Sequence, residues 1–175
     1  GTEQVRAYWT PGTLPIGRPI TTTALGTFVG TTGISFTTPL SPTGTYYIVA
    51  VGQSSHAVAF KPFAVIPALF ITPTRGAAGS AVTVIGTGYR ANEAVTIWWD
   101  CPSKTCGSAM PLGTKTTNAN GDVGLGATIP ATATAGAHVL GGKGGISGAF
   151  ATAAYTVTMP PPTNTATATP TRTAT

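Results

Sequence analysis

Apolar and polar residues alternate along several short segments of the chain, as they do in half-buried β-strands. The clearest case is residues 94–100, in which Val95, Ile97 and Trp99 alternate with more polar neighbours. An alternation of period two places these three side chains on one face of a pleated strand. The same reasoning predicts seven strands in the second half of the chain: residues 68–73, 80–85, 94–100, 112–117, 122–129, 136–141 and 148–158. Short strands separated by frequent turns are typical of a β-sandwich.

Residues 3–9 and 93–99 are close variants of one segment, so the chain contains an internal repeat. The correspondence continues from residues 25–27 to residues 112–114. Four further pairs are each separated by 92 positions: Gly44 and Gly136, Gly52 and Gly144, Phe63 and Tyr155, Val65 and Val157. A repeat of this length indicates tandem structural units. We therefore expect one unit over residues 1–67, a second over residues 68–159, and a tail over residues 160–175.

The first unit is expected to be incomplete, because residues 68–92 have no counterpart before Glu3. Its predicted strands are residues 4–10, 20–24, 33–38, 44–51 and 56–66, so it lacks the first two strands of the repeat. A sheet without them would expose an apolar groove and an unpaired backbone edge. The candidate strand-acceptor groove consists of Val5, Ile34, Phe36, Tyr46, Ile48, Val58, Phe60 and Phe63.

The composition favours strands and turns over helices. Charged residues make up 7% of the chain, and 35 threonines, 23 glycines and 15 prolines replace the usual helix formers. The net charge of +5 reflects the presence of only four acidic residues, since the nine basic residues are scattered. No basic cluster favours nucleic acid as a partner. No apolar run is long enough to cross a membrane as a helix.

Cys101 and Cys106 lie in one short loop directly after a predicted strand. A structural disulfide is the simplest interpretation, with free thiols as the alternative. A zinc site would need two further ligands, and neither histidine has the spacing of a ligand pair. A disulfide favours an oxidising, extracellular location.

The tail from Pro160 is a low-complexity segment rich in threonine and proline. Such a composition cannot form a packed core and is typical of O-glycosylated stalks. The candidate O-glycosylation sites are Thr163, Thr165, Thr167, Thr169, Thr171, Thr173 and Thr175. We expect the tail to be extended, and the candidates for what holds it are another subunit, the missing edge of the first unit, and covalent glycans.

No set of residues in the sequence has the spacing of a catalytic site, a cofactor-binding loop or a metal site. The glycines near positions 86 and 141 lack the helix that phosphate-binding loops require, so we expect no enzyme activity and no cofactor. Trp9 and Trp99 share the inward phase of their strands, as core tryptophans do. Tyr8 and Trp98 point the other way, and they form a candidate aromatic platform for a carbohydrate ligand.

The segment 71–89, the strand 95–100, the turn at Asn120 and Gly121, and Pro130 and Gly136 together carry a resemblance to a known family. Residues 68–158 resemble the IPT/TIG-type immunoglobulin-like repeats of bacterial surface proteins. Residues 3–67 resemble the same repeat without its first two strands. The resemblance implies an extracellular, all-β protein of two tandem immunoglobulin-like sandwiches, with no catalytic residues to transfer.

Three functions are compatible with these features. In the first, the chain is the subunit of a pilus-like or fibril-like filament, a homopolymer in which a neighbouring copy supplies strands to the incomplete unit. Head-to-tail contacts that do not close would then build an open fibre. In the second, the chain is a spacer within a longer surface-repeat protein. In the third, it is a carbohydrate-binding adhesin module. We expect the filament subunit.

Overall fold

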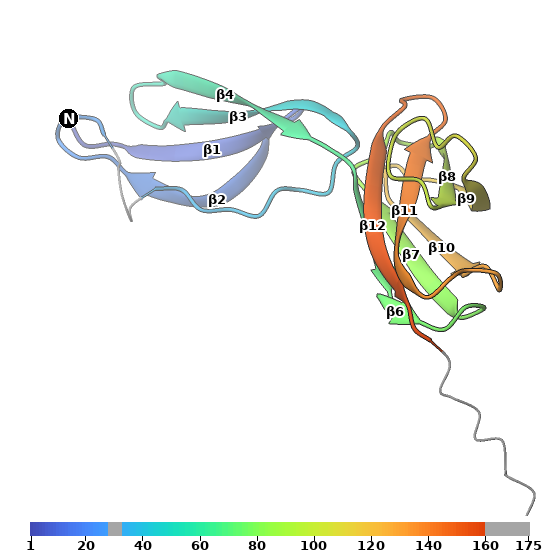
Figure 1. The fold of residues 1–175 in the computed structure, drawn as a ribbon. Coiled ribbons are helices and arrows are strands. Elements are labelled where there is room, and N and C mark those ends of the chain that lie inside the picture. Colours follow the sequence, from blue (N-terminus) through green and yellow to red (C-terminus); the bar gives the residue numbers. More distant parts are fainter. Residues whose placement is uncertain (28–32, 160–175) are drawn as a thin grey trace, which may run out of the picture.

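The computed structural model describes residues 1–27 and 33–159, and every regular element in these ranges is a β-strand. Figure 1 shows the strands in two groups, one built from the blue and cyan part of the chain and one from the green to orange part. The predicted all-β class is confirmed. The threonine-rich tail and its candidate glycosylation sites lie outside the described residues.

The first group is a single antiparallel sheet, which we call the N-terminal sheet. Its spatial order is β2-β1-β3-β4. The strands are β1 (Gln4–Thr10), β2 (Leu14–Thr21), β3 (Gly44–Gly52) and β4 (Val58–Val65).

The second group is a sandwich of two sheets, which we call the C-terminal sandwich. One sheet has the order β10-β7-β5 and the other the order β6-β12-β11-β8-β9. The strands are β5 (Ala68–Thr72), β6 (Arg75–Gly76), β7 (Ala81–Thr87), β8 (Ala94–Trp99), β9 (Met110–Thr116), β10 (Val123–Thr128), β11 (Gly136–Gly144) and β12 (Phe150–Val157).

The core of the C-terminal sandwich lies between its two sheets. Val95, Ile97 and Trp99 of β8 point inward and are 0%, 1% and 6% exposed, as the alternation predicted. Leu69 and Val84 pack against them from the opposite sheet. Because each sheet buries one face and leaves the other in contact with solvent, its strands show the period of two that is visible in the sequence.

The internal repeat is visible in the topology. The order β2-β1-β3-β4 of the N-terminal sheet is the order β9-β8-β11-β12 of the larger sheet in the C-terminal sandwich. The registers agree as well, since Trp9 pairs with Ile48 and the equivalent Trp99 pairs with Leu140. Within the described residues, the N-terminal sheet has no partner that corresponds to the sheet β10-β7-β5.

The predicted strand at residues 20–24 and the match of residues 25–27 with 112–114 are wrong. The strand there is β2, Leu14–Thr21, and Leu25 lies beyond it, 89% exposed. Leu14 pairs with Trp9 as Met110 pairs with Trp99. The error has a simple cause. β1 and β2 are joined by residues 11–13 whereas β8 and β9 are joined by residues 100–109, so the spacing of the two copies changes at this loop, and the shared triplet Leu-Gly-Thr lies at unrelated positions.

The predicted strand at residues 33–38 is also absent. In the C-terminal sandwich the corresponding strand, β10, forms its ladder with β7. The N-terminal sheet has no counterpart of β7 among the described residues, so residues 33–38 have no backbone partner with which to form a ladder. The alternation of apolar residues in this segment therefore indicated which side chains pack against the sheet, namely Ile34 and Phe36, but it did not show whether the segment pairs as a strand.

The two groups are joined by Ile66 and Pro67, which separate β4 from β5. A second contact lies beside this link, where the backbone N–H of Thr43 donates to the carbonyl oxygen of Tyr89 at 2.9 Å. Tyr89 is fully buried, and its hydroxyl donates to the carbonyl oxygen of Gly142 at 3.1 Å. Burial and, secondarily, the nearby Glu93 raise the pKa of Tyr89, so the phenol stays protonated.

Candidate partner-binding face

Three aromatic rings dominate one face of the N-terminal sheet. We call it the inner face, and it is the face that carries Val5, Ala7 and Trp9. The indole of Trp9 stacks on Tyr46 with ring centroids 5.0 Å apart and meets the edge of Phe63 at 5.5 Å. Strand alternation and register explain the cluster, because Tyr46 and Phe63 are cross-strand neighbours on β3 and β4.

The C-terminal sandwich repeats this aromatic cluster at equivalent positions. Trp99 stacks on His138 at 4.5 Å and meets the edge of Tyr155 at 6.1 Å. His138 and Tyr155 are themselves cross-strand neighbours. The two faces are therefore built on one plan and can be compared position by position.

The two faces differ in how well they are covered. Tyr155 is 1% exposed, whereas its counterpart Phe63 is 36% exposed. Leu140 is fully buried, whereas its counterpart Ile48 is only partly buried. In the sandwich the cover comes from β5, β7 and β10, and this sheet has no counterpart over the inner face of the N-terminal sheet within the described chain.

A short segment gives the inner face part of its cover. Ile34 and Phe36 pack against the cluster of Ala7, Trp9 and Ile16 but remain partly exposed themselves. One irregular segment thus stands where the sandwich has three strands. The result is an apolar face that is only partly covered, and exposed apolar patches often mark interaction sites.

The structure separates the residues of the predicted acceptor groove. Val5, Ile34, Phe36, Tyr46, Ile48 and Phe63 belong to the inner face or pack over it. Val58 and Phe60 do not, because they pair with Val51 and Val49, whose side chains point to the opposite face. Those two residues cannot line the same groove. The groove was predicted from hydrophobicity alone, and the prediction ignored that alternate side chains of β4 point to opposite faces of the sheet.

Val58 and Phe60 instead form an apolar patch on the outer face of the sheet. They are 61% and 70% exposed, and Tyr47 meets the edge of Phe60 at 5.8 Å. The patch is a shallow depression of about 420 Å³ that Thr10 and Val49 complete. In the C-terminal sandwich the position of Val49 is taken by Gly141, and the loop after β8 lies across it.

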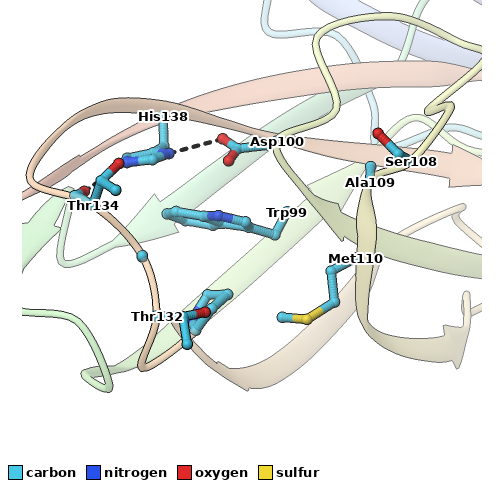
Figure 2. A pocket seen from close by; sticks show the side chains of 10 residues that line it. Trp99, Asp100, Ser108, Ala109, Met110, Thr132, Thr134 and His138 are labelled. Carbon is cyan, nitrogen blue, oxygen red and sulfur yellow. Dashed lines mark hydrogen bonds and ion pairs between the residues drawn. The ribbon is translucent and has the colours of Figure 1, made fainter.

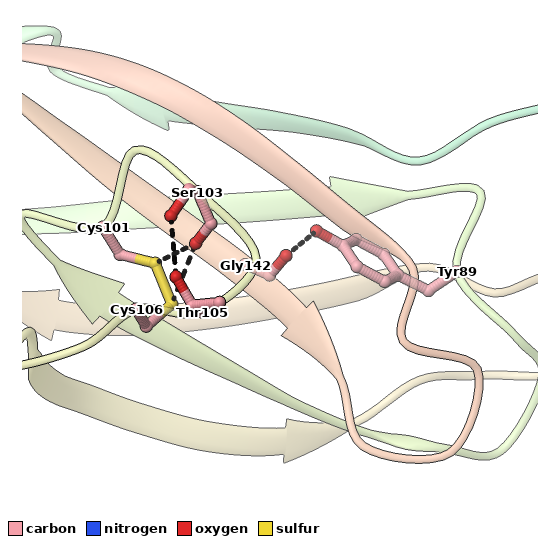
Figure 3. Close-up of a disulfide and its surroundings, with 6 residues drawn as sticks. All are labelled: Tyr89, Cys101, Ser103, Thr105, Cys106 and Gly142. Atoms are coloured by element: carbon pink, nitrogen blue, oxygen red, sulfur yellow. Dashed lines mark hydrogen bonds between the residues drawn. A yellow bond between two sulfur atoms is a disulfide. The ribbon is translucent and has the colours of Figure 1, made fainter.

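That loop contains the disulfide predicted from the sequence. Cys101 and Cys106 are bonded to each other, and Figure 3 shows the bond beside Ser103 and Thr105. Cys101 is fully buried and its N–H donates to the carbonyl oxygen of Val139 at 3.0 Å. A Cβ atom on Gly141 would lie 2.8 Å from the sulfur of Cys101, so glycine permits the loop to lie on β11.

Tyr8 and Trp98, the candidate aromatic platform, lie on different sheets and are not brought together. Both side chains are half-buried, and the indole nitrogen of Trp98 is buried without a hydrogen-bond partner in the described part of the chain. Each residue occupies the same position in its own copy of the repeat. The arrangement offers two separate aromatic rings rather than one platform.

One repeated polar cluster was missed from the sequence. In the C-terminal sandwich the carboxylate of Glu93 accepts hydrogen bonds from the backbone of Ile146 (3.1 Å), the backbone of Ser147 (2.9 Å) and the hydroxyl of Ser147 (2.7 Å). In the N-terminal sheet Glu3 accepts equivalent bonds from Ser54 and Ser55. Each glutamate thereby fastens the start of one strand to the hairpin between two others.

A threonine completes each cluster. Thr117 exchanges hydrogen bonds with the backbone of Glu93, and Thr22 does the same with the backbone of Glu3. Two of the four acidic residues occur at the same place in the repeat, with Ser55 and Ser147 separated by the same 92 positions as the glycine pairs. The repeated positions of the two glutamates and the two serines were the feature of the sequence from which these clusters could have been predicted.

These hydrogen bonds set the acidity of both glutamates. Burial alone would raise the pKa of Glu93, but the bonds from Ser147, Arg90 and Ile146 outweigh it and hold the pKa below its usual range. The bonds from Ser55, followed by the one from Ser54, lower the pKa of Glu3 despite the opposing effect of burial. Both clusters are built around the ionised form of the acid.

Residues 1–27 and 33–159 contain no group of three or more histidine, cysteine or acidic side chains placed to hold a metal ion. No helix that could span a membrane occurs among the residues that the structure describes. The candidate site is the inner face of the N-terminal sheet, which is mainly apolar and aromatic.

The two packed sheets and the matching third sheet define an immunoglobulin-like β-sandwich protein with a repeated unit. Residues 66–157 match the model of the macroglobulin-like domain, which is more than half of the chain. The chain therefore belongs to the macroglobulin-like domain family. No curated protein matches the sequence.

Two of the solved structures that are similar to the chain illustrate the likeness. One is described as a tetra-tandem repeat in the extending region of a large adhesion protein, at 14% identity and a TM-score of 0.37, covering 87% of this chain and 42% of that one. The other comprises three N-terminal domains of the highly immunogenic outer capsid protein of bacteriophage RB49, at 13% identity and a TM-score of 0.29, covering 87% and 48%. The chain thus spans less than half the length of each.

Proposed function

We propose that the chain is a non-catalytic structural module of an extracellular surface assembly. In this proposal the inner face of the N-terminal sheet accepts strands from a second copy, and repeated docking builds a filament. The observation that carries the proposal is the exposure of Phe63, 36% against 1% for the equivalent Tyr155, on two faces of identical strand order.

The C-terminal sandwich shows which side chains the covering strands would need. There, β5 presents Leu69 and Ile71 and β7 presents Val82 and Val84, each with one residue between them. An extended segment with the same alternation would pack its apolar side chains onto Trp9, Ile48 and Phe63. Backbone pairing at a free strand edge adds directional hydrogen bonds to this burial.

In the alternative function, the covering strands come from the same polypeptide rather than from a second copy. In the C-terminal sandwich β5 and β7 come directly before β8 in the chain, so strands of this type are readily supplied within one polypeptide. The module would then be a spacer in a longer surface protein and would not polymerise. The chemistry of the accepting face is the same in both cases.

The test compares two substitutions on one strand. Phe63→Asp places a charge on the inner face, and Phe60→Asp places the same charge on the outer face of β4. The assembly of the full chain is followed by sedimentation and electron microscopy over increasing protein concentration. We expect fibres for the parent chain and for Phe60→Asp, and monomers for Phe63→Asp. Circular dichroism verifies that both variants remain folded, and Phe63→Ala replaces Phe63→Asp if they do not.

A second measurement separates the filament from the spacer. A synthetic peptide with the sequence of residues 68–87 is added to the full chain, and amide protection of β1, β3 and β4 is measured by hydrogen exchange. Peptide binding without fibres would refute the filament and favour the spacer. The absence of both fibres and peptide binding would refute strand acceptance altogether.

A further inference from the structure

His138 holds a hydrogen-bond acceptor at each of its two ring nitrogens. Its Nδ1 lies 2.8 Å from a carboxylate oxygen of Asp100, and its Nε2 lies 2.8 Å from the carbonyl oxygen of Thr134. Figure 2 shows the ring between these groups, above the indole of Trp99. A neutral imidazole has one N–H and can satisfy only one of the two acceptors, whereas the imidazolium satisfies both.

The surroundings favour the charged ring. Burial alone lowers the pKa of His138, but the carbonyl of Thr134 and the carboxylate of Asp100 outweigh this effect and raise it above the usual value. The stacking on Trp99, with an interplanar angle of 27°, adds attraction between the cation and the aromatic face.

The first copy of the repeat makes the aromatic stack and the carbonyl contact with a tyrosine. Tyr46 takes the position of His138 and stacks on Trp9 at 5.0 Å. Its hydroxyl donates to the carbonyl oxygen of Pro42 at 2.8 Å, four residues earlier in the chain, as Thr134 is four residues before His138. A phenol has one donor and serves one acceptor, whereas the imidazolium serves two.

The segment held by Tyr46 makes contact with the following unit. Thr43, next to Pro42, donates its N–H to the carbonyl oxygen of Tyr89, and Leu40 lines a depression together with Gly88. The equivalent segment in the second copy is residues 130–135. It borders a depression of about 400 Å³ beside Trp99.

We propose that His138 is a pH-dependent clasp on the segment 130–135. The protonated ring ties the carbonyl of Thr134 to the carboxylate of Asp100, and loss of the proton breaks one of the two bonds and frees the segment. Tyr46 is the counterpart of His138 in the first copy, with one hydroxyl donor in place of two ring nitrogens. The proposal does not depend on strand acceptance by the N-terminal sheet.

Few other ionisable groups face this ring in the described part of the chain. Asp100 follows β8, and Tyr155 of β12 is the cross-strand neighbour of His138. Lys143 is at the other end of β11, and Arg75 of β6 lies beyond β12, paired with Thr156. The segment 130–135 itself contains no ionisable side chain.

The first test follows the proton directly. His56→Asn leaves His138 as the only histidine, and asparagine tolerates the positive φ of 57° at that site. An NMR titration of the full chain is expected to give a pKa above about 6.5 for His138. The amide signals of residues 131–135 are expected to move with the same midpoint. A midpoint at or below the usual value, or neighbours that do not follow it, would overturn the proposal.

The second test removes the switch in two ways. His138→Tyr copies the solution found at Tyr46, and Asp100→Asn gives the ring a partner that can accept or donate. The raised pKa adds stability that is complete below about pH 6.5 and is lost as the pH rises through the raised value. The melting temperature of the parent chain is therefore expected to fall across this window. Both variants are expected to show a smaller fall, and an unchanged fall in both would refute the clasp.

Discussion

Glu93 is a fully buried acid whose carboxylate receives four hydrogen bonds, from the backbone of Arg90, Ile146 and Ser147 and from the hydroxyl of Ser147. A buried carboxylate is stable only when such donors replace its hydration. The cluster therefore acts as a polar fastening in an otherwise apolar sandwich. Its weaker counterpart at Glu3 is more exposed to solvent.

Replacing Glu93 by glutamine should destabilise the C-terminal sandwich by about 1–3 kcal/mol at pH 7, because the amide nitrogen would face N–H and O–H donors. The sign of the pH dependence follows from the lowered pKa of Glu93. Stability from this group is present above the usual pKa of glutamate, near 4.3, and is lost as the pH falls through the lower folded value. Urea unfolding of the parent and variant between pH 7 and pH 3 should show a gap that narrows in acid.

Glu3→Gln is the matched control for this experiment, since it makes the same change in the other copy of the repeat. It should have the smaller effect, because water can replace bonds to a more exposed carboxylate. An equal loss for both variants, or a gap that widens in acid, would contradict this account.

At the scale of elements, the loop between β8 and β9 covers the outer face of the larger sheet in the C-terminal sandwich, whereas apolar side chains occupy the equivalent face of the N-terminal sheet. The disulfide between Cys101 and Cys106 closes it, and Gly141 lets it lie against β11. The equivalent connection in the N-terminal sheet is residues 11–13, and there Val49 and Phe60 occupy the outer face instead. The length of this loop thus decides whether the outer face of the sheet is covered by a loop or by its own apolar side chains.

Removing the disulfide should destabilise the C-terminal sandwich by about 2 kcal/mol, the loop-closure entropy of a ring of this size. The variant with serine at both Cys101 and Cys106 should melt at a lower temperature than the parent in differential scanning calorimetry. A reducing agent should lower the melting temperature of the parent and leave the variant unchanged. A reductant effect on the variant, or none on the parent, would show that the bond does not stabilise this loop.

At the scale of the whole molecule, the contact between the two parts depends on very small groups. Gly121 has a φ of +80°, and a Cβ atom there would overlap the carbonyl oxygen of Tyr89 and lie 3.1 Å from the Cα of Pro42. That carbonyl accepts the bond from Thr43. The glycine therefore permits both the turn before β10 and the approach of the N-terminal part.

Gly121→Ala should separate the two parts at this point, because both the backbone conformation and the space are unsuited to a side chain. The amide of Thr43 should exchange with solvent faster than in the parent. Gly124→Ala is the control, since a Cβ atom there meets nothing within 4 Å. Unchanged exchange at Thr43 in Gly121→Ala, with the sandwich still folded, would contradict the prediction.

The sequence by itself determined the fold class, seven of the eight strands of the second half and the disulfide, whereas the two-residue strand β6 was not predicted. Local signals suffice for these features, since alternation specifies which residues a strand buries, and one short turn brings together two cysteines with four residues between them. The inward phase of Trp9 and Trp99 followed for the same reason. The repeat also gave the correct correspondence of Phe63 with Tyr155.

Only the tertiary structure decided which strands pair and what covers each face. Residues 33–38 have the pattern of a strand but no neighbour to bond, and Val58 and Phe60 were assigned to a groove on the wrong side of β4. The clusters at Glu93 and His138 join residues that are 54 and 38 positions apart. Such contacts depend on the register of distant strands, and register is a property of the assembled sheet rather than of any one segment.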